Sequence, residues 1–528
     1  MTIAQGGAAL AIDLGTGGLK VGIFDSGGRL VRSATAEVPS AYGPGGAATQ
    51  DAEGWWKAVV SMAASLTQQT GLGPEVRAIA CTGQWASTVP VDADGNVVGE
   101  CLLWMDTRGG ALSAARIGGR AAGYNAARAL RFIRKSGGAP SRYGADPIGH
   151  ILYLESEEPG VASKARWYLE PVDFLTMRIT GKVTATAASM TAAWLTDNRV
   201  PGALEYDAEL IGMAGIPAAK LPPLVPAGSM VGTIRPEVAV AMGISGEARV
   251  VTGLPDLHTA VMGSGATRIG EVHLCLSTTS WISAPVARKK TDVLHSVATV
   301  PGIAAGEYFI ADNHETAGEC LDWLRSSLVA PGDMLGPGGF SPSFAELDQL
   351  AATAVPGCGG VIFTPWLAGE RSPVDDRNAR AGFLGISLAT TRAEMVRSVL
   401  EGVAYSNRWL YESVRRFLRA EPTSLRILGG GATSDLWCQI HADVLDLTVE
   451  RVEEPIFANL RGAALVAMVG TGMIGAEVAR RAVEVGKTFV PNASLSRVYT
   501  ANYRVFSKIY SRQKPLFAAL ESARKAAG

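Results

Sequence analysis

Apolar residues at the start of the chain fall into three short runs separated by turn residues. The first run, 8–14, leads into a glycine-rich turn, and Ser26-Gly27-Gly28 separates the second run, 20–25, from the third, 29–38. Runs of this length joined by glycine turns predict three antiparallel strands. A dinucleotide-binding Rossmann domain would place a helix directly after its first glycine loop, so the pattern argues against that fold.

A change to helical spacing follows at residue 51. Asp51 can cap a helix whose apolar positions include Trp55, Val59 and Leu66, and the run 76–82 then predicts a buried strand. Later segments repeat both patterns. Helices are expected at 392–419, 434–445 and 459–468, a strand at 425–428, and a basic surface helix or tail at 499–528.

The middle of the chain is interrupted by a region rich in proline and glycine, 217–232. After it come a strand at 249–253, then Asp256, and a strand at 272–276 that enters a turn of hydroxyl residues. This order repeats the first half: a strand, an acidic residue and a turn of small residues. We therefore expect an α/β fold of two related halves that face a cleft. The predicted units are 1–250, 251–490 and a C-terminal segment, 491–528.

Composition narrows the classes of function. The 528 residues are 47% hydrophobic, and 48 basic side chains nearly balance 49 acidic ones. A balanced charge gives no electrostatic footprint for nucleic acid or an anionic membrane. Six scattered cysteines without a CxxC pair suit reduced thiols better than a disulfide framework. We expect a cytoplasmic protein with a small-molecule partner, no nucleic-acid or membrane partner, and a homodimer as one assembly left open.

The first glycine-rich turn carries residues suited to a phosphate. Glycines such as Gly15 allow backbone N–H groups to approach an anion, and Lys20 supplies a positive charge. Asp13, just before the turn, can hold a hydrated Mg²⁺. The alternative is an ordinary hairpin turn with a solvated lysine, because glycine-rich motifs are common.

Two further turns also follow apolar strands. Thr278 and Thr279 can offer hydroxyl and N–H groups to a second phosphate, or they are β-branched strand residues without such a role. Gly430, Gly431 and Ala432 stand between a strand and a helix, where an adenosine group can lie against the backbone. The alternative for this third turn is a tight strand-to-helix connection. Three such turns in one chain together favour nucleotide binding.

Polar and aromatic residues near these turns are candidates for substrate chemistry. Asp256, which follows a proline, is either a helix N-cap or a carboxylate that reaches the cleft, and one residue can do both. Gln84 and Trp85 follow a buried strand and can hydrogen-bond to a sugar and stack on it. Trp104 and Asp106 form a similar pair. The alternatives are core packing for each tryptophan and a helix N-cap for Asp106.

Together these segments resemble the FGGY family of carbohydrate kinases, and within it the xylulose kinases. The resemblance extends from about residue 8 to residue 475, in the family's order and spacing. The matching segments are 13–20, 82–84, 103–108, 172–175, 252–266, 276–279, 365–373, 382–401, 429–434 with Ala442-Asp443, and 461–464.

The resemblance implies an actin-like fold of two ribonuclease-H-like domains flanking a central cleft, where ATP, Mg²⁺ and a small sugar or polyol meet. It implies that Asp256 is the general base, and that Asp13 and Asp256 lie near the metal. By position, the resemblance implies Thr16, Lys20, Thr278 and Thr279 for phosphates, Gly431, Ala432 and Asp435 for adenosine, and Gln84, Trp85, Trp104 and Asp106 for substrate. We add Gly15 and Gly430 of the same turns to the nucleotide-binding set, and Asp256 and His258 to the substrate-binding set.

Several positions depart from the xylulose kinase pattern. Ala86 stands where a polar residue is usual, and Leu257 stands where an amide usually follows the base. Each hydrogen bond lost to a sugar hydroxyl costs about 1–3 kcal/mol, so we expect the pocket to discriminate against D-xylulose. Ser277 and Pro255 replace glycines, and His150 replaces a lysine.

Two other functions use the same fold. An actin- or chaperone-like ATPase shares the nucleotide loops but needs no aromatic sugar pocket at Gln84, Trp85 and Trp104. A sugar-binding sensor without catalysis is the second alternative, and retention of both Asp13 and Asp256 argues against it. The sequence therefore favours an ATP-dependent kinase acting on a hydroxyl of a small sugar or polyol.

Overall fold

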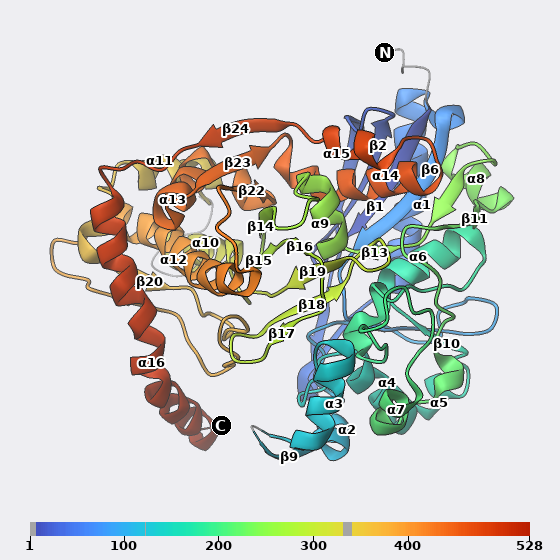
Figure 1. Cartoon of the computed structure of the whole chain (residues 1–528), viewed down its shortest axis with the longest axis horizontal. Helices are drawn as coiled ribbons and strands as arrows, with labels where there is room; N and C mark the ends of the chain where they lie inside the picture. Colours follow the sequence, from blue (N-terminus) through green and yellow to red (C-terminus); the bar gives the residue numbers. More distant parts are fainter. Residues whose placement is uncertain (1–6, 122, 331–340, 528) are drawn as a thin grey trace.

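The computed structural model describes residues 7–121, 123–330 and 341–527; the outer ends of the first and last predicted units, 1–6 and 528, lie outside this range. The described residues form two α/β lobes. The N-terminal strands lie in one lobe, and the C-terminal helix α16 (Ser496–Ala527) runs along the outside of the other (Figure 1). The predicted α/β fold of two halves is confirmed.

The sheet of the first lobe is built around β1, a strand whose residues are all buried. β1 pairs antiparallel with β2 and parallel with β6, and β2 pairs antiparallel with β3, as the hairpin pattern predicts. Three strands end at one edge, because Leu14 pairs with Gly83 and Gly83 pairs with Pro255. The sheet order is β11 (Met230–Thr233), β12 (Arg249–Val251), β6 (Val76–Gly83), β1 (Ala8–Leu14), β2 (Gly18–Asp25) and β3 (Leu30–Glu37), with β13 (Leu254–Pro255) beside the end of β6.

The second lobe repeats this arrangement. β14 pairs antiparallel with β15 and parallel with β22, which pairs parallel with β23. An antiparallel neighbour on one side and parallel strands on the other also surround β1, so the expected relation between the halves is visible in the strand order. The sheet order is β15 (Ser280–Ser283), β14 (Val272–Leu276), β22 (Ser424–Leu428), β23 (Thr448–Val452) and β24 (Val485–Phe489).

Helices begin and end at the caps that the sequence supplies. Asp51 accepts the Glu53 N–H at the start of α1, Gly71 ends α1 in the left-handed conformation, and Thr391 and Glu394 form a capping box for α12. The helices up to residue 264 are α1 (Ala52–Thr70), α2 (Gly110–Ile117), α3 (Ala126–Ser136), α4 (Pro147–Glu157), α5 (Pro159–Ala162), α6 (Pro171–Thr180), α7 (Ala208–Ala214), α8 (Pro236–Met242) and α9 (Asp256–Ser264). Those beyond it are α10 (Gly318–Leu324), α11 (Phe344–Ala352), α12 (Arg392–Leu418), α13 (Asp435–Leu445), α14 (Ala458–Gly470), α15 (Ala476–Arg481) and α16.

A small antiparallel sheet links the two lobes. Thr291 of this sheet donates to the Gly137 carbonyl at 3.0 Å, and Tyr308 donates to the Asn198 carbonyl at 2.8 Å. Figure 1 shows its strands reaching from the second lobe toward the first. Its order is β16 (Pro285–Val286), β19 (Tyr308–Ala311), β18 (Val297–Pro301) and β17 (Thr291–Asp292). Smaller ladders are β4 (Ala41–Gly43), β5 (Ala47–Gln50) and β8 (Cys101–Leu102); β7 (Val89–Val91) and β10 (Trp167–Leu169); and β20 (Ile362–Thr364) and β21 (Gly382–Leu384).

The C-terminal helix α16 is exposed on one face and buried on the other. Its basic composition predicts a surface helix or tail, and α16 is a helix. Tyr499 and Phe506 are nevertheless buried, and Phe506 and Phe517 pack around Trp366 of the second core. Aromatic residues recur at helical spacing among the lysines and arginines, so one stripe of α16 joins the core while the opposite face carries the charge.

Two helices cross between the sheets at glycine. α14 packs its buried alanines, Ala463 and Ala464, on β1 and β6 of the first sheet, and α9 packs through Ala260 on the second sheet. A Cβ on Gly263 would lie 1.8 Å from the Ala458 carbonyl oxygen, and one on Gly462 would lie 1.9 Å from the Thr259 carbonyl oxygen. Only glycine permits this approach, so the crossing fixes α9, and with it Asp256, against the first sheet.

Replacing Gly462 with alanine tests this crossing. The added Cβ must force α9 and α14 apart, and overpacking of this kind costs about 1–3 kcal/mol. We expect Gly462→Ala to lower Tm by several degrees in thermal unfolding followed by circular dichroism. Gly212→Ala is the matched control, because Gly212 lies inside α7, a Cβ added there would meet no heavy atom within 4 Å, and alanine favours a helix. Equal stability of the two variants would contradict the proposed contact.

Candidate active site

The first glycine turn joins β1 to β2 and holds a charged pair at its base. Asp13 and Lys20 are direct partners in the antiparallel register, and Lys20 Nζ lies 3.3 Å from Asp13 Oδ2. The carboxylate of Asp13 is buried and raises the pKa of Lys20. Above this pair the turn closes with a hydrogen bond from the Gly15 N–H to the Gly18 carbonyl at 2.9 Å. Lys20 therefore remains an ammonium beside the turn.

Asp256 lies next to this pair, at the first position of α9. Its Oδ1 accepts the Leu257 N–H at 2.8 Å, which holds one carboxylate oxygen in the first turn and leaves Oδ2 available. The N-cap of α9 is Pro255, so Asp256 is not the N-cap. Burial, and then the negative charge of Asp13, raise the pKa of Asp256 to about 7, while Lys20 opposes the shift. The electrostatic coupling of Asp13, Lys20 and Asp256 agrees with their places at one edge of the first sheet.

The second and third turns lie at the end of β14. Cys275 is electrostatically coupled to both Asp256 and Lys20, which places the end of β14 beside the first turn. Two residues further on, Ser277 N–H donates to the Thr279 carbonyl at 2.9 Å, and the Thr278 side chain is exposed. Gly431 lies against Leu276, because a Cβ there would lie 2.6 Å from the Leu276 side chain. The three turns predicted for a nucleotide are thus connected through one strand.

The glycine turn before α13 leaves room beside its backbone. Gly430 is exposed, a Cβ on it would meet no heavy atom within 4 Å, and Ala432 is buried behind it. Asp435, in the first turn of α13, instead makes ion pairs with Arg451 at 2.6 Å and Lys487 at 2.5 Å. These cations, Lys487 first, lower the pKa of Asp435. The open backbone at Gly430 suits a flat ring, whereas the Asp435 carboxylate is held by β23 and β24.

The polar groups predicted to contact substrate are largely used within the protein. Trp104 Nε1 donates to Thr16 Oγ1 at 3.1 Å, and Thr16 Oγ1 in turn lies 3.4 Å from Gln84 Oε1. Gln84 is buried, and its Nε2 donates to Gln50 Oε1 at 2.9 Å. The Trp85 indole N–H donates to the Ser189 carbonyl at 2.6 Å. Both tryptophans are therefore oriented by hydrogen bonds to their own chain.

Asp106 is a buried structural carboxylate. Its oxygens accept the Ala48 N–H at 3.0 Å, the Arg108 N–H at 3.0 Å, and the Arg108 guanidinium at 2.7 Å. The cap of α2 is Gly109, so Asp106 is not its N-cap. These contacts hold the loop that carries Trp104, and the Asp106 side chain is paired with Arg108.

His258 is also fully buried. Its Nε2 lies 2.8 Å from the Pro301 carbonyl, and its ring packs edge-on against Trp85 and Phe309. Burial lowers the pKa of His258 to about 4, so the ring is neutral at physiological pH. The structure thus brings His258 beside Trp85, at the start of the helix that carries Asp256.

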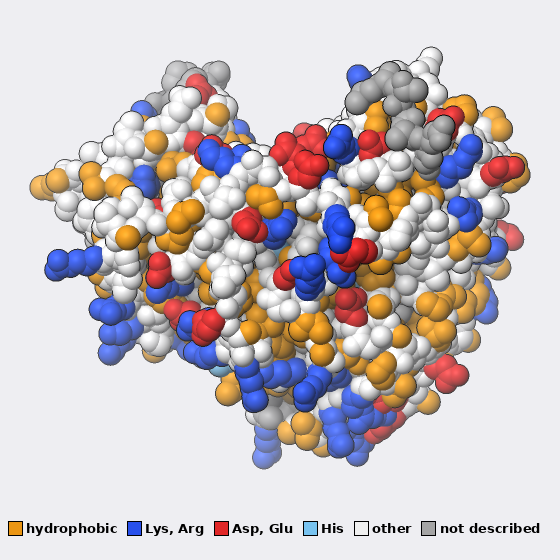
Figure 2. Space-filling model, turned by 45° about the horizontal axis from the view of Figure 1, so that its top comes forward, with side chains coloured by type: hydrophobic (Ala, Val, Ile, Leu, Met, Phe, Trp, Pro, Cys, Tyr) orange, Lys and Arg blue, Asp and Glu red, His pale blue; other side chains and the backbone are white. Residues whose placement is uncertain are grey.

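The carboxylates fit a cation that arrives with a nucleotide. No group of three or more His, Cys, Asp or Glu side chains able to hold a metal occurs in the described part of the chain. Mg²⁺ commonly binds through one or two carboxylates together with substrate phosphates and water. Asp13 and Asp256 offer such a pair: burial first, and then the negative charge of Asp13, raise the pKa of Asp256, and a cation would offset both effects. Figure 2 shows a hollow between the lobes with acidic and basic side chains on its rim.

Comparison with protein families decides the identity of the fold. Models for the N-terminal and C-terminal domains of FGGY carbohydrate kinases match residues 8–263 and 270–471. The chain belongs to the FGGY family of carbohydrate kinases. The predicted family is thereby confirmed, and the FGGY kinase is an enzyme that transfers phosphate from ATP to a sugar.

Relatives that span most of the FGGY kinase are named for different sugar and polyol substrates. It is 27% identical to a xylulose kinase of Staphylococcus epidermidis, over 97% of this chain and 98% of the relative. It is 28% identical to a glycerol kinase of Gloeobacter violaceus, over 97% and 98%. The crystal structure of gluconate kinase from Lactobacillus acidophilus superposes with a TM-score of 0.84 at 21% identity, covering 97% of this chain and 99% of that one. The structural likeness supports the fold.

Two residues that support the site were missed from the sequence. Gln50 Nε2 donates to the Thr16 carbonyl at 2.7 Å, and Gln50 Oε1 accepts a hydrogen bond from Gln84. This amide therefore connects the first glycine turn to Gln84. Glu170 is buried and accepts the Ser87 N–H at 3.2 Å, which holds the loop after Trp85. Burial raises the pKa of Glu170 well above its usual range. The only sequence signal is a polar residue at the end of an apolar run, which is weak evidence by itself.

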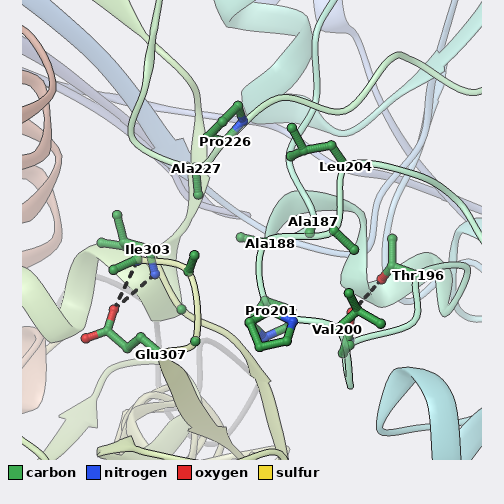
Figure 3. A pocket seen from close by; sticks show the side chains of 18 of the residues that line it. Ala187, Ala188, Thr196, Val200, Pro201, Leu204, Pro226, Ala227, Ile303 and Glu307 are labelled. Carbon is green, nitrogen blue, oxygen red and sulfur yellow. Dashed lines mark hydrogen bonds between the residues drawn. The ribbon is translucent and has the colours of Figure 1, made fainter.

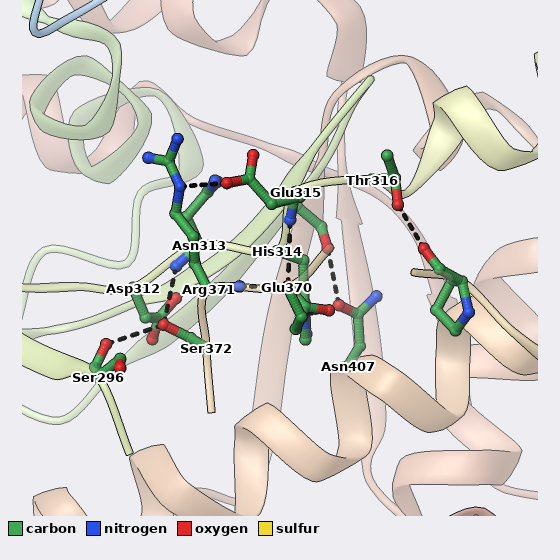
Figure 4. A network of polar contacts seen from close by, with 12 residues as sticks. Ser296, Asp312, Asn313, His314, Glu315, Thr316, Glu370, Arg371, Ser372 and Asn407 are labelled. Atoms are coloured by element: carbon green, nitrogen blue, oxygen red, sulfur yellow. Dashed lines mark hydrogen bonds and ion pairs between the residues drawn. The ribbon is translucent and has the colours of Figure 1, made fainter. Parts of the chain in front are cut away.

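A loop of the second lobe reaches Trp104 of the first lobe. The Arg371 guanidinium lies 5.1 Å from the ring centre of Trp104 and forms an ion pair with Glu315. Figure 4 shows the network behind this contact, in which the buried His314 and Glu370 pair at 2.9 Å. The sequence placed Glu370 and Arg371 in a family motif without a role. Their contacts connect the second lobe to Trp104.

No helix within the described residues is both long and apolar enough to cross a membrane.

The pKa of Asp256 predicts how pH affects stability. Between about pH 4 and pH 7 the folded protein keeps a proton on Asp256 that the unfolded chain has lost, so this group contributes less stability as pH rises. Asp256→Asn cannot ionise. We expect the Tm of the variant, relative to that of wild type, to rise by a few degrees from pH 5 to pH 8. Calorimetry without nucleotide measures this difference.

The matched control for this measurement is Asp435→Asn. The pKa of Asp435 is lowered by its cations, so the wild-type carboxylate stabilises the fold at neutral pH and loses that effect in acid. The Tm of Asp435→Asn should therefore be lower than that of wild type at pH 8. The Tm difference between variant and wild type thus has the opposite sign from the one expected for Asp256→Asn at that pH. A constant Tm difference for Asp256→Asn across this range would contradict the placement of Asp256 beside Asp13.

Proposed function

We propose that the FGGY kinase phosphorylates a hydroxyl of a small sugar or polyol, with Asp256 as the general base. The observation that carries the proposal is the free Oδ2 of Asp256, on a carboxyl with a pKa of about 7, beside Asp13 and Lys20. A carboxylate with a pKa near the working pH can accept a hydroxyl proton and later release it. A base of this kind contributes about 10²–10⁴-fold to rate.

The surrounding residues have separate tasks in this mechanism. Lys20 and the backbone N–H groups of the Gly15 turn face the phosphoryl group and stabilise the charge that spreads over it. Asp13 keeps Lys20 in place and, with Asp256, would hold Mg²⁺, which supplies positive charge to the nucleotide phosphates. Thr278 and Thr279 offer contacts to the phosphates from the second lobe, and Gly430 gives adenosine a flat backbone surface. Trp85 and Trp104 orient the acceptor.

We place this reaction in the cytoplasm. All six cysteines are described, and each is a buried free thiol. Reduced thiols of this kind are typical of a reducing compartment.

Removal of the Asp256 carboxylate tests the mechanism. We expect Asp256→Ala to lower kcat at least a hundredfold, because the hydroxyl loses its proton acceptor, while ADP still binds through the turns around Gly15 and Gly430. Sugar-phosphate formation and calorimetric ADP binding measure the two effects. Asp92→Ala, in an exposed turn, is the control and should retain wild-type kcat. A variant at Asp256 that keeps more than about a tenth of wild-type kcat would show that another group accepts the proton.

The pocket supports a substrate with few hydroxyls near the base. Both indole N–H groups and the Gln84 amide have partners within the chain. Leu257 is buried against Phe309 and Val300, so this position presents hydrocarbon where xylulose kinases have an amide. Ala86 adds a methyl group. The acceptor is therefore held mainly by the aromatic faces and Asp256, and D-xylulose leaves hydroxyls unpaired at a cost of about 1–3 kcal/mol each.

A panel of acceptors tests this specificity. We expect D-xylulose to have a kcat/KM at least about tenfold below that of the best acceptor among pentuloses, pentitols, tetritols and glycerol. Ala86→His should raise kcat/KM for D-xylulose about tenfold, because it returns one hydrogen bond. Ala86 already has a φ of 63°, a left-handed conformation that histidine adopts more readily than most residues. If D-xylulose is the best acceptor for wild type, the pocket argument fails and the kinase assignment remains.

A further inference from the structure

His258 occupies the point at which three parts of the molecule meet. It lies on α9, two residues after Asp256; its ring centre is 6.1 Å from that of Trp85 and 5.4 Å from that of Phe309. Trp85 belongs to the first lobe, and Phe309 belongs to β19 of the linking sheet. The imidazole is therefore packed between the tryptophan proposed to stack on substrate and the sheet that connects the lobes.

The hydrogen bond of His258 has a defined direction. A backbone carbonyl can only accept, so the 2.8 Å contact with the Pro301 oxygen requires the proton on Nε2. The other nitrogen, Nδ1, is buried without a hydrogen-bond partner. His258 is thus a neutral donor with one directed bond, and that bond connects the catalytic helix to the end of β18.

The segment that receives this bond borders a pocket on its first-lobe side. A cavity of about 160 Å³ separates the turn between β18 and β19 from the first lobe. Figure 3 shows Ile303 and Glu307 on one wall and Ala187, Ala188 and Pro201 on the other. Hydrogen bonds hold the turn at both ends: His258 to Pro301 at one, and Tyr308 to Asn198 at the other. The strands on either side of the turn pack directly on α9, because Val300 and Phe309 form one buried cluster with Leu257 and Val261. The His258 bond adds a fixed direction to this packing, which apolar contacts alone do not supply.

We propose that His258 is a positioning residue that fixes Asp256 and Trp85 relative to the linking sheet, so that base and substrate-stacking ring keep one geometry when the lobes approach each other. This inference rests on the proposed roles of Asp256 and Trp85. It assigns His258 a role through its neighbours and not as a substrate ligand. Loss of the bond to Pro301 frees the first turn of α9, which precedes the contacts with α14 at Thr259 and Gly263, and misplacement by about 1 Å can lower a rate a hundredfold.

Two substitutions separate the bond from the ring. His258→Phe keeps an aromatic ring without a donor, and His258→Gln keeps a side-chain N–H. With ATP and the best acceptor of the panel, we expect His258→Phe to lower kcat about tenfold to a hundredfold with little change in the acceptor KM, and to release more ADP than sugar phosphate. His258→Gln should recover part of the loss. His295→Gln is the control, because His295 pairs with Asp292 within the linking sheet and should leave all three quantities unchanged.

Hydrogen exchange of the protein alone gives a readout that needs no substrate. We expect the amides of α9 to exchange faster in His258→Phe than in wild type. Unchanged kcat and product ratio in His258→Phe would overturn the proposal, and so would a tenfold rise in acceptor KM at constant kcat, which would make His258 a substrate ligand. If wild type phosphorylates no acceptor, the proposed function fails separately. In that case exchange in α9 decides for His258: faster exchange supports the positioning role, and equal exchange overturns it.

Discussion

The crossing of α9 and α14 is the contact on which both lobes depend. At Gly263 and Gly462 each helix backbone lies so close to the other that no Cβ fits between them. α14 lies on the first sheet, α9 packs on the second, and Asp256 is the first residue of α9. The position of Asp256 relative to the turn between β1 and β2 is therefore set by backbone contact. Close-packed backbone has fewer ways to relax than flexible side chains, so this position is well defined in the folded protein.

The charges at the edge of the first sheet follow from that constraint. Asp13 is the next-to-last residue of β1 and pairs with Thr82, and β13 leads directly into Asp256, so both carboxylates are brought to the same edge. Burial of Asp256 and the charge of Asp13 outweigh the effect of Lys20, so the pKa of Asp256 stays raised. A perturbed pKa of this kind is characteristic of functional sites, where charge is arranged for a task instead of for stability. The same two effects make the edge favourable for a cation or for an arriving proton.

Local features of the molecule were predictable from the sequence, and partners across the chain were not. The strand pattern, the Asp51 cap and the three glycine or threonine turns depend on neighbouring residues, and the structure has each of these elements. The partner of a polar side chain depends on tertiary approach. Asp106 therefore reads as a sugar ligand in sequence but is held by Arg108 and Ala48. For the same reason α14 reads as part of the second half although it packs on the first sheet, and the buried stripe of α16 is concealed by its basic residues.

The internal hydrogen bonds of the pocket have a consequence for how substrate and phosphate are connected. Trp104 donates to Thr16, Gln84 lies beside the same hydroxyl, and Gln50 holds the Thr16 carbonyl. A displacement of Trp104 would therefore also displace Thr16 and the turn between β1 and β2. Arg371 of the second lobe lies over the ring of Trp104 and so contacts the same group of hydrogen-bonded residues. An acceptor that packs well against Trp104 thus favours one arrangement of both the phosphate turn and the opposite lobe. Polar groups that are satisfied within the protein give up direct hydrogen bonds to the sugar, and in exchange they hold the reacting groups in a fixed relation before the substrate arrives.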